Sequence, residues 1–146
     1  MPKFRKATEE DIKHIAMLEA DIFSDTWTVQ GIRETFSQKQ TFIIVAEDES
    51  MLAGYCIVYY VMDEAEIARI AVSPALRRQG VGRGLLDYTC KCCLEERIGR
   101  LLLDVRESNQ GAVAFYRQYG FAEDGIRRNF YDNPQENAVL MSKTLV

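Results

Sequence analysis

Residues 77–86 read RRQGVGRGLL and combine the two residue types that hold phosphate groups. The stretch contains the glycines Gly80, Gly82 and Gly84 and the arginines Arg77, Arg78 and Arg83. Glycine lets a ligand approach the backbone closely, and arginine attracts anions. An apolar run typical of a helix follows, so unpaired N–H groups at the start of that helix would face the same ligand. The stretch therefore predicts a pyrophosphate cradle, against the alternative of a flexible solvated turn.

Two common phosphate-binding motifs fit this stretch poorly. A P-loop requires G-x-x-x-x-G-K-S/T, which the sequence lacks. A dinucleotide-binding fold places G-x-G-x-x-G directly after its first strand, whereas here the spacing is G-x-G-x-G and the residues SPALRR intervene after Val72. Asp104 does lie at a suitable distance for a ribose contact, which keeps the dinucleotide alternative open, although few strands remain after residue 72.

The motif resembles the Q/R-x-x-G-x-G/A signature of the GNAT acetyltransferases, with Arg77, Gly80 and Gly82 in the defining positions. The flanking stretches DEAEIARIAVSPALRRQGVGRGLLD, LLLDVRESNQGAVAFYRQYGF and IRRNFY are similar to those of RimI-type ribosomal-protein alanine N-acetyltransferases. The resemblance extends from about residue 4 to residue 146. It implies an α/β fold of the α+β type, with a mixed, mostly antiparallel sheet flanked by about four helices in one domain over residues 1–146.

The resemblance also implies acetyl-CoA as the cosubstrate and a set of residues that bind it. In the family, the strand before the signature holds the pantetheine through its backbone, and the signature holds the pyrophosphate. Carried over, the expected contacts are Ile70, Ala71, Val72, Arg77, Arg78, Gln79, Gly80, Val81, Gly82, Arg83, Asn109 and Tyr116.

Acetyl transfer to an amine requires a base for the amine proton and an acid for the departing thiolate. RimI-type enzymes use a glutamate on the strand after the signature helix and a tyrosine twelve residues further on. Here these positions hold Asp104, which is one methylene shorter, and Tyr116. Other family members carry the base on the preceding strand, where Glu66 lies. Asp104 as a salt-bridge partner, Tyr116 as core packing and Glu66 as an exposed edge carboxylate are the structural alternatives.

The expected acceptor is the α-amine of a protein N-terminus, in particular an N-terminal alanine of a ribosomal protein. Phe23, Trp27 and Tyr131 lie in segments that flank the acceptor entry in the family, so we expect them to contact the acceptor. A lysine side chain or a small-molecule amine is the alternative acceptor. A non-catalytic acyl-CoA sensor is a third possibility, which the shortened carboxylate favours and Tyr116 opposes.

These residues need a mixed α/β framework to position them. In the first half, the pattern predicts a short strand at 4–7, a helix at 9–22 with a Thr8–Asp11 capping box, a loop at 23–27, a helix from Thr28 to about Phe36, and strands at 41–48, 51–63 and 64–73. In the second half, it predicts a helix at 84–99, a strand at 100–107, a helix at 108–121 that stops at Gly120, and two strands around the turn at 132–136.

Composition narrows the class of protein. The 146 residues carry a net charge of −4, which argues against direct nucleic-acid binding. Cys90 and Cys93 form a C-x-x-C, but no second ligand pair accompanies it, so we expect no metal site and thiols in a reducing compartment. The longest apolar stretch, residues 51–62, is too short to span a membrane. The sequence predicts a cytoplasmic protein, away from membranes, that is a monomer or weak dimer.

Overall fold

The computed structural model describes residues 2–145 and contains a seven-stranded sheet in the order β1-β2-β3-β4-β5-β7-β6. All neighbouring strands are antiparallel except β4 and β5. The strands are β1 (Lys3–Lys6), β2 (Thr41–Asp48), β3 (Met51–Val61), β4 (Glu64–Val72), β5 (Arg100–Arg106), β6 (Ala122–Tyr131) and β7 (Glu136–Thr144). The expected mixed, mostly antiparallel sheet is confirmed.

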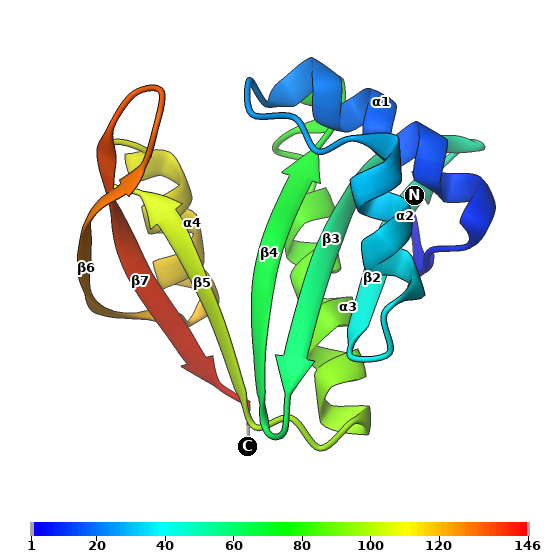
Figure 1. The fold of residues 1–146 in the computed structure, drawn as a ribbon. Coiled ribbons are helices and arrows are strands. Elements are labelled where there is room, and N and C mark those ends of the chain that lie inside the picture. Colours follow the sequence, from blue (N-terminus) through cyan, green and yellow to red (C-terminus); the bar gives the residue numbers. More distant parts are fainter. Residues whose placement is uncertain (1, 146) are drawn as a thin grey trace.

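Four α-helices and two short 3-10 turns cover the two faces of the sheet. They are η1 (Glu9–Asp11), α1 (Ile12–Ile22), α2 (Val29–Ser37), η2 (Pro74–Leu76), α3 (Val81–Glu95) and α4 (Gln110–Tyr119). Helices α3 and α4 lie behind the sheet in Figure 1, whereas α1 and α2 lie in front of β2 and β3. Within residues 2–145, each helix is too short or too polar to cross a membrane.

Two apolar clusters correspond to the two covered faces. The larger one packs α3 and α4 against the sheet through residues such as Leu85, Leu86 and Val113. The smaller one packs α1 and α2 against β2 and β3 through residues such as Ile15 and Ile32. On the α1 side, the covering helices do not extend over β5, β7 and β6, which leaves that half of the face open (Figure 1).

The parallel contact between β4 and β5 is short. Only Glu64, Ala65 and Glu66 of β4 pair with β5, opposite Arg100, Leu101 and Leu102. Beyond this seam the two strands diverge, as Figure 1 shows. From Ile67 onward, the β5-facing edge of β4 has no strand partner among residues 2–145. A sheet that opens in this way exposes unpaired backbone groups of β4 to whatever occupies the opening.

The predicted boundaries hold for most elements and fail at one helix. The Thr8 N–H donates to the Asp11 carboxylate at 2.7 Å, which confirms the capping box, and Thr28 caps α2 by accepting from the Gly31 N–H at 3.0 Å. The helix expected at 84–99 is wrong at both ends, because it begins at Val81 and ends at Glu95.

The end of α3 is set by Arg97 and Ile98 rather than by Gly99. Arg97 adopts a left-handed conformation with φ of 61°. The Ile98 N–H then returns to the Cys93 carbonyl at 2.8 Å, and the Ile98 side chain is buried. This is the pattern of a Schellman C-cap, in which an apolar residue after the left-handed one packs back onto the helix. The sequence pointed to Gly99 because glycine is the usual residue at that position.

Candidate active site

The loop before α3 forms a concave backbone surface of the kind that binds anions. Gly80 precedes the helix with φ of 82°, and Arg78 is also left-handed with φ of 64°. The first helical hydrogen bond runs from the Gly84 N–H to the Gly80 carbonyl at 3.0 Å. The N–H groups of residues 81–83 therefore precede the first helical bond and have no acceptor within α3. Such groups at a positive helix end fit a pyrophosphate.

The glycines Gly80, Gly82 and Gly84 have different structural roles. A Cβ on Gly80 would meet no atom within 4 Å, so Gly80 is required for its backbone conformation. A Cβ on Gly82 would lie 3.4 Å from the Phe115 ring, an ordinary contact. A Cβ on Gly84 would lie 2.0 Å from the Phe4 ring. The expectation that Gly84 clears space for phosphate is corrected: Gly84 lets β1 pack against α3.

Residues 70–72 lie on the part of β4 that diverges from β5. Ala71 is buried in the cluster below α1, while Ile70 and Val72 pack against the α3 cluster. Contacts from this strand to a ligand would therefore be made by its backbone, and the expected contact with acetyl-CoA stays a prediction. The Arg77 Nε donates to the Val72 carbonyl at 3.3 Å, which brings one arginine of the cradle to the same strand end. Val81 is buried, so its side chain belongs to the core and only its N–H is available.

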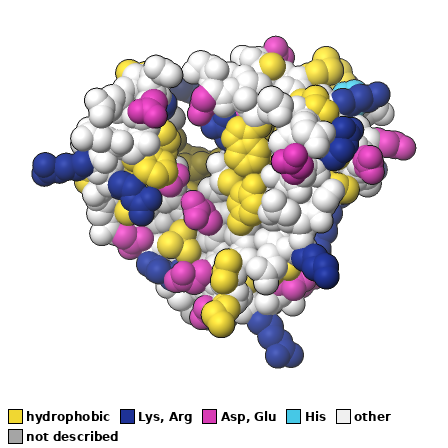
Figure 2. All heavy atoms as spheres, viewed as in Figure 1, with side chains coloured by type: hydrophobic (Ala, Val, Ile, Leu, Met, Phe, Trp, Pro, Cys, Tyr) yellow, Lys and Arg dark blue, Asp and Glu magenta, His cyan; other side chains and the backbone are white. Residues whose placement is uncertain are grey.

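Glu66 and Asp104 share the open face of the sheet beside the seam. Their neighbours Ala65, Leu101 and Leu103 are buried in the α3 cluster, so alternation places both carboxylates on the opposite face. Since Glu66 pairs with Leu102, Asp104 lies two residues further along the adjacent strand. Figure 2 shows this face hollowed between the two halves of the sheet, with charged side chains around the hollow.

Burial opposes ionisation of both carboxylates, and repulsion by Asp104 adds to this effect at Glu66. Burial raises the pKa of Glu66, and the negative charge of Asp104 raises it further. Burial also raises the pKa of Asp104. The guanidinium of Arg127 acts in the opposite direction on both groups. Arg127 reaches them from β6, where its register through Ala138 of β7 places it on the same face of the sheet.

Tyr116 occupies the other side of the opening, on α4. Its side chain is 8% exposed and packs edge-on against Phe115 and Phe121, with ring centroids 5.3 and 5.6 Å away. Burial raises the pKa of Tyr116, and Cys56 and Tyr131 raise it further, so the hydroxyl stays protonated at neutral pH. Among residues 2–145 this hydroxyl has no hydrogen-bond partner, which leaves its proton available to a ligand.

Phe23 and Trp27 are brought together by a residue that the sequence did not single out. The guanidinium carbon of Arg69 lies 3.7 Å from the centre of the Phe23 ring and 5.9 Å from that of Trp27. Arg69 is also paired with Glu19, at 2.6 Å between Nη2 and Oε2. The two aromatic residues therefore form one wall beside β4, and residues 23–28 that carry them are attached to the strand.

Tyr131 lies across the opening from that wall, near the end of β6. Arg106 stacks over its ring at 4.5 Å. Burial raises the pKa of Tyr131 to about 12, and the charge of Asp104 contributes to the shift. Arg69 also acts on Tyr131 electrostatically, in the lowering direction. The structure thus gathers Tyr131, Asp104 and the Phe23–Trp27 wall around one opening.

Asn109 lies at the start of α4 and serves that helix. Its side-chain oxygen accepts from the Ala112 N–H at 3.2 Å, so Asn109 is the N-cap residue. The side chain is exposed, and its amide NH₂ remains the group that a ligand could meet. Its expected contact with acetyl-CoA stays a prediction.

Three residues of this site were missed from sequence. Arg69, Glu19 and Arg127 are brought to the opening by contacts between distant segments, and Arg69 follows Glu19 by 50 positions in the sequence. One signal did exist for Glu19, which continues the apolar spacing of Ile12, Ile15 and Ala16 in α1. A carboxylate in a buried helical stripe indicates a buried partner. Arg127 gives no such signal in an exposed strand.

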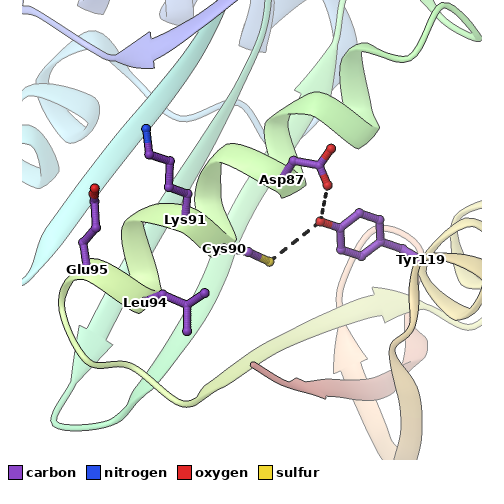
Figure 3. Close-up of a pocket in the computed structure, with 6 residues that line it drawn as sticks. All are labelled: Asp87, Cys90, Lys91, Leu94, Glu95 and Tyr119. Atoms are coloured by element: carbon purple, nitrogen blue, oxygen red, sulfur yellow. Dashed lines mark hydrogen bonds between the residues drawn. The ribbon is translucent and has the colours of Figure 1, made fainter. Parts of the chain in front are cut away.

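A separate hollow lies between α3 and α4. It is lined by Asp87, Cys90, Lys91, Leu94, Glu95 and Tyr119 (Figure 3). The Tyr119 hydroxyl donates to Asp87 at 2.6 Å and lies 3.8 Å from the Cys90 sulfur. None of the residues expected to act in catalysis or to bind acetyl-CoA lines it. Within residues 2–145, Cys90 and Cys93 do not belong to any group of three or more metal-ligand side chains.

Comparison with known proteins agrees with this geometry. The acetyltransferase (GNAT) family model matches residues 10–121. A Bacillus subtilis (strain 168) protein with the provisional name ribosomal protein bS18-alanine N-acetyltransferase is 36% identical over 93% of this chain and 91% of its own length. The Escherichia coli (strain K12) protein of that name is 40% identical over 62% of this chain and 63% of its own length.

Solved structures show the same fold over the whole chain. The ribosomal-protein-S18-alanine N-acetyltransferase from Escherichia coli superposes with a TM-score of 0.91 and 28% identity, covering 99% of this chain and 94% of that one. Ard1 from Thermoplasma volcanium has a TM-score of 0.91 and 25% identity, covering 99% and 98%. The dinucleotide-binding alternative is therefore discarded. The chain belongs to the GNAT acetyltransferase family and is an acetyl-CoA-dependent N-acetyltransferase.

Proposed function

We propose that this enzyme acetylates the α-amine of a protein N-terminus, with an N-terminal alanine of a ribosomal protein as its acceptor. The names of the similar bacterial proteins support this acceptor class. The observation that carries the proposal is the opening beyond the β4–β5 seam, where Glu66 and Asp104 lie on the open face and Tyr116 lies on α4. This arrangement supports one of the two carboxylates as the base and Tyr116 as the acid.

In this proposal the chain binds acetyl-CoA between the diverging strands. The thioester supplies the acetyl group. Backbone groups of residues 70–72 bind the pantetheine, and the N–H groups of residues 81–83 with Arg77, Arg78 and Arg83 bind the pyrophosphate. The backbone conformations of Arg78 and Gly80 support this role, because they shape an anion-binding concavity. Gln79 contributes backbone to the same loop, and Asn109 offers its free amide from the start of α4.

Asp104 or Glu66 would take the proton of the attacking amine. Asp104 lies on the diverging part of β5, and its shorter side chain favours transfer through a water molecule. Tyr116 would donate a hydrogen bond or proton to the departing sulfur, since its hydroxyl is protonated and unpaired among residues 2–145. Phe23, Trp27 and Tyr131 would contact the acceptor from the two sides of the opening.

An α-amine suits a weak or water-relayed base. Its pKa is about 7.7–8.0, whereas that of lysine is about 10.4. The difference of about 2.5 pKa units corresponds to roughly 3.5 kcal/mol of deprotonation that the site need not supply at neutral pH. The raised pKa values of Glu66 and Asp104 make each a stronger base than an ordinary carboxylate.

A peptide assay with acetyl-CoA tests this proposal. An alanine-starting peptide without lysine is compared with an N-terminally blocked peptide that contains lysine, and the acetylated product is measured by mass spectrometry. We expect the first peptide to react and the second to remain unmodified. Faster acetylation of the blocked lysine peptide would refute the α-amine acceptor, and binding of acetyl-CoA without turnover on any amine would favour an acyl-CoA sensor.

The base is then assigned by pH–rate profiles with the alanine peptide. Asp104→Asn should lower the rate most at acidic pH, where the amine is protonated, and less as the pH approaches about 9. Asp104→Glu should be tolerated. If Glu66→Gln loses activity and Asp104→Asn does not, the base is Glu66.

A further inference from the structure

A buried ion pair connects β4 with residues 23–28, which carry Phe23 and Trp27. These two side chains are called the acceptor wall, because the proposed function has them contact the acceptor. The Glu19 carboxylate, at the C-terminal end of α1, is 0% exposed. It accepts from Arg69 Nη2 at 2.6 Å and from Arg69 Nε at 3.1 and 3.2 Å. It also accepts from the Tyr55 hydroxyl of β3 and from the Trp27 backbone N–H, the latter at 3.0 Å. One carboxylate thus joins two strands to residues 23–28.

Arg69 holds the same segment from the other side. Its guanidinium stacks on Phe23 at 3.7 Å and donates to the Asp25 carbonyl at 2.8 Å. The first, third and fifth residues of segment 23–28 are therefore attached to the Glu19–Arg69 pair. Burial disfavours the Arg69 charge, but the hydrogen bonds to Glu19 and Asp25 and their negative charges together outweigh burial and raise the pKa of Arg69, so its guanidinium stays charged. A planar guanidinium that makes several hydrogen bonds to one carboxylate fixes both the distance and the orientation of the two groups.

The position of Arg69 in the strand gives this attachment a consequence for the reaction. Arg69 lies three residues beyond Glu66, on the part of β4 that has no β5 partner among residues 2–145. The same stretch of backbone continues into residues 70–72, which the proposed function assigns to acetyl-CoA. The strand beside the thioester and the wall beside the amine are therefore held at a fixed separation by a single side-chain pair.

We propose that Glu19 and Arg69 are positioning residues that set the acceptor amine relative to the thioester, by fixing Phe23 and Trp27 against β4. The inference rests on the proposed function for the identity of the acceptor, but the attachment itself does not. Releasing the wall lets the amine adopt unproductive orientations. Misplacement by about 1 Å costs on the order of 100-fold in rate, whereas acetyl-CoA, held by the cradle and the β4 backbone, should bind as before.

The variants are chosen so that the protein still folds. Arg69→Met alone would leave the buried Glu19 charge without its main partner, which is strongly destabilising. Glu19→Gln keeps the shape and the acceptor oxygen while it removes the charge. The double variant Glu19→Gln/Arg69→Met removes both charges together, and replacing a buried pair by groups of similar volume is often tolerated. Arg69→Lys keeps the charge but loses the planar, multiply bonded contact.

The chain offers a matched control in the Arg5–Asp11 pair. It also joins a strand arginine to a largely buried carboxylate at the helical segment, with Nη1–Oδ2 and Nη2–Oδ1 distances of 2.7 and 3.0 Å. Arg5 belongs to β1 and Asp11 to η1, and the pair touches none of the residues around the opening. Asp11→Asn would keep an oxygen that can accept from the Thr8 N–H of the capping box, so the double variant Arg5→Met/Asp11→Asn reports the cost of losing a pair of this kind while Phe23 and Trp27 stay in place.

The first measurement does not depend on activity. Trp27 is the only tryptophan of the chain, so its fluorescence reports on the wall alone. We expect acrylamide to quench Trp27 more strongly in the Glu19→Gln/Arg69→Met and Arg69→Lys variants than in the wild type, while the Arg5→Met/Asp11→Asn control keeps the wild-type quenching constant. Unchanged quenching in folded Glu19 and Arg69 variants would overturn the proposed attachment, whatever the enzyme's acceptor is.

The second measurement separates acceptor from cosubstrate. We expect kcat/KM for the alanine-starting peptide to fall about 10- to 100-fold in the Glu19→Gln/Arg69→Met variant, with the KM for acetyl-CoA within about twofold of wild type. Equal losses in the Arg5→Met/Asp11→Asn control, or an equal rise in the KM for acetyl-CoA, would show a general structural role and overturn the positioning role. If the wild-type enzyme does not acetylate the alanine-starting peptide, the proposed function is refuted instead. The quenching result does not depend on that outcome.

Discussion

Replacing Tyr116 by phenylalanine separates chemistry from packing at one position. The ring contacts with Phe115 and Phe121 at 5.3 and 5.6 Å involve the aromatic system alone, so phenylalanine keeps them. The lost hydroxyl has no hydrogen-bond partner among residues 2–145, and removing such a group deletes no protein contact. We expect the free energy of unfolding to stay within about 0.5 kcal/mol of wild type, or to rise slightly.

Turnover should respond very differently. A positioned general acid contributes about 10²–10⁴ in rate, which corresponds to roughly 3–5.5 kcal/mol of activation free energy. The raised pKa of Tyr116 keeps its proton in place across the neutral range, so the wild-type hydroxyl is in the donating form there. We therefore expect Tyr116→Phe to lower kcat by at least about 100-fold with little change in the affinity for acetyl-CoA.

Tyr119 provides the opposite behaviour three residues further along the chain. Its hydroxyl donates to Asp87 at 2.6 Å in the hollow of Figure 3, away from the opening. Tyr119→Phe should lose about 1 kcal/mol of stability, or about 2–4 °C in melting temperature, and keep the wild-type kcat. Calorimetry gives the first quantity. Mass spectrometry of the acetylated peptide gives the second and avoids interference from the four free cysteines in a thiol-release assay.

The two variants together make the reasoning refutable. If Tyr116→Phe turns over at the wild-type rate, Tyr116 only packs, and the acid must be sought elsewhere. If Tyr116→Phe instead loses both activity and several kcal/mol of stability, the hydroxyl has a structural role that the unpaired geometry excludes. If Tyr119→Phe loses activity to the same extent, kcat depends on the packing of α4 as a whole rather than on one hydroxyl.

Two further predictions concern the cradle and the cleft charges. Gly82→Val should weaken acetyl-CoA binding at least about tenfold, measured by calorimetry, because a branched side chain would fill space at the helix start. Gly84→Ala should keep that affinity and cost about 1–3 kcal/mol of stability, since its Cβ would lie 2.0 Å from the Phe4 ring. If Gly84→Ala weakens binding and Gly82→Val does not, the phosphate lies at Gly84 rather than at Gly82. Arg127→Gln removes a charge that lowers the pKa of both cleft carboxylates, so their pKa values should rise and the acidic limb of the pH–rate profile should move to higher pH. An unmoved limb would show that neither carboxylate is the titrating base.

Local patterns predicted the parts of this fold that depend on neighbouring residues. The strand at 41–48 and the cap at Thr28 follow from β-branched runs and from a side chain that satisfies nearby N–H groups, so both are readable from a few residues. The pyrophosphate cradle could be predicted for the same reason, because its glycines and arginines are contiguous, and it stays a prediction. The start of α3 was missed, since glycine disfavours a helix interior while it suits the cap position that Gly80 occupies.

Contacts between residues that lie far apart in the sequence could not be predicted from local patterns. Glu66 and Asp104 share a face because β4 and β5 pair in one particular register, which no local pattern specifies. Arg69 looked like one more residue of a strand, and its contacts with Glu19 and Phe23 depend on how α1 crosses the sheet. Gly84 was misjudged because the residue that needs its missing side chain, Phe4, lies at the other end of the sequence.

The unpaired edge of β4 also determines how the protein should exchange its amide hydrogens. One edge of this strand pairs with β3 from Glu64 to Val72, interrupted by a bulge at Ala68, while the other edge is bonded to β5 only at the first three residues. From Arg69 onward, past the bulge, alternate amides therefore point toward β3 or toward the opening. In the free protein, deuterium should enter every second position of this stretch quickly and the positions between them slowly. If pantetheine binds here as proposed, it would take the place of the missing neighbour strand, so its binding should erase that alternation and be detectable residue by residue.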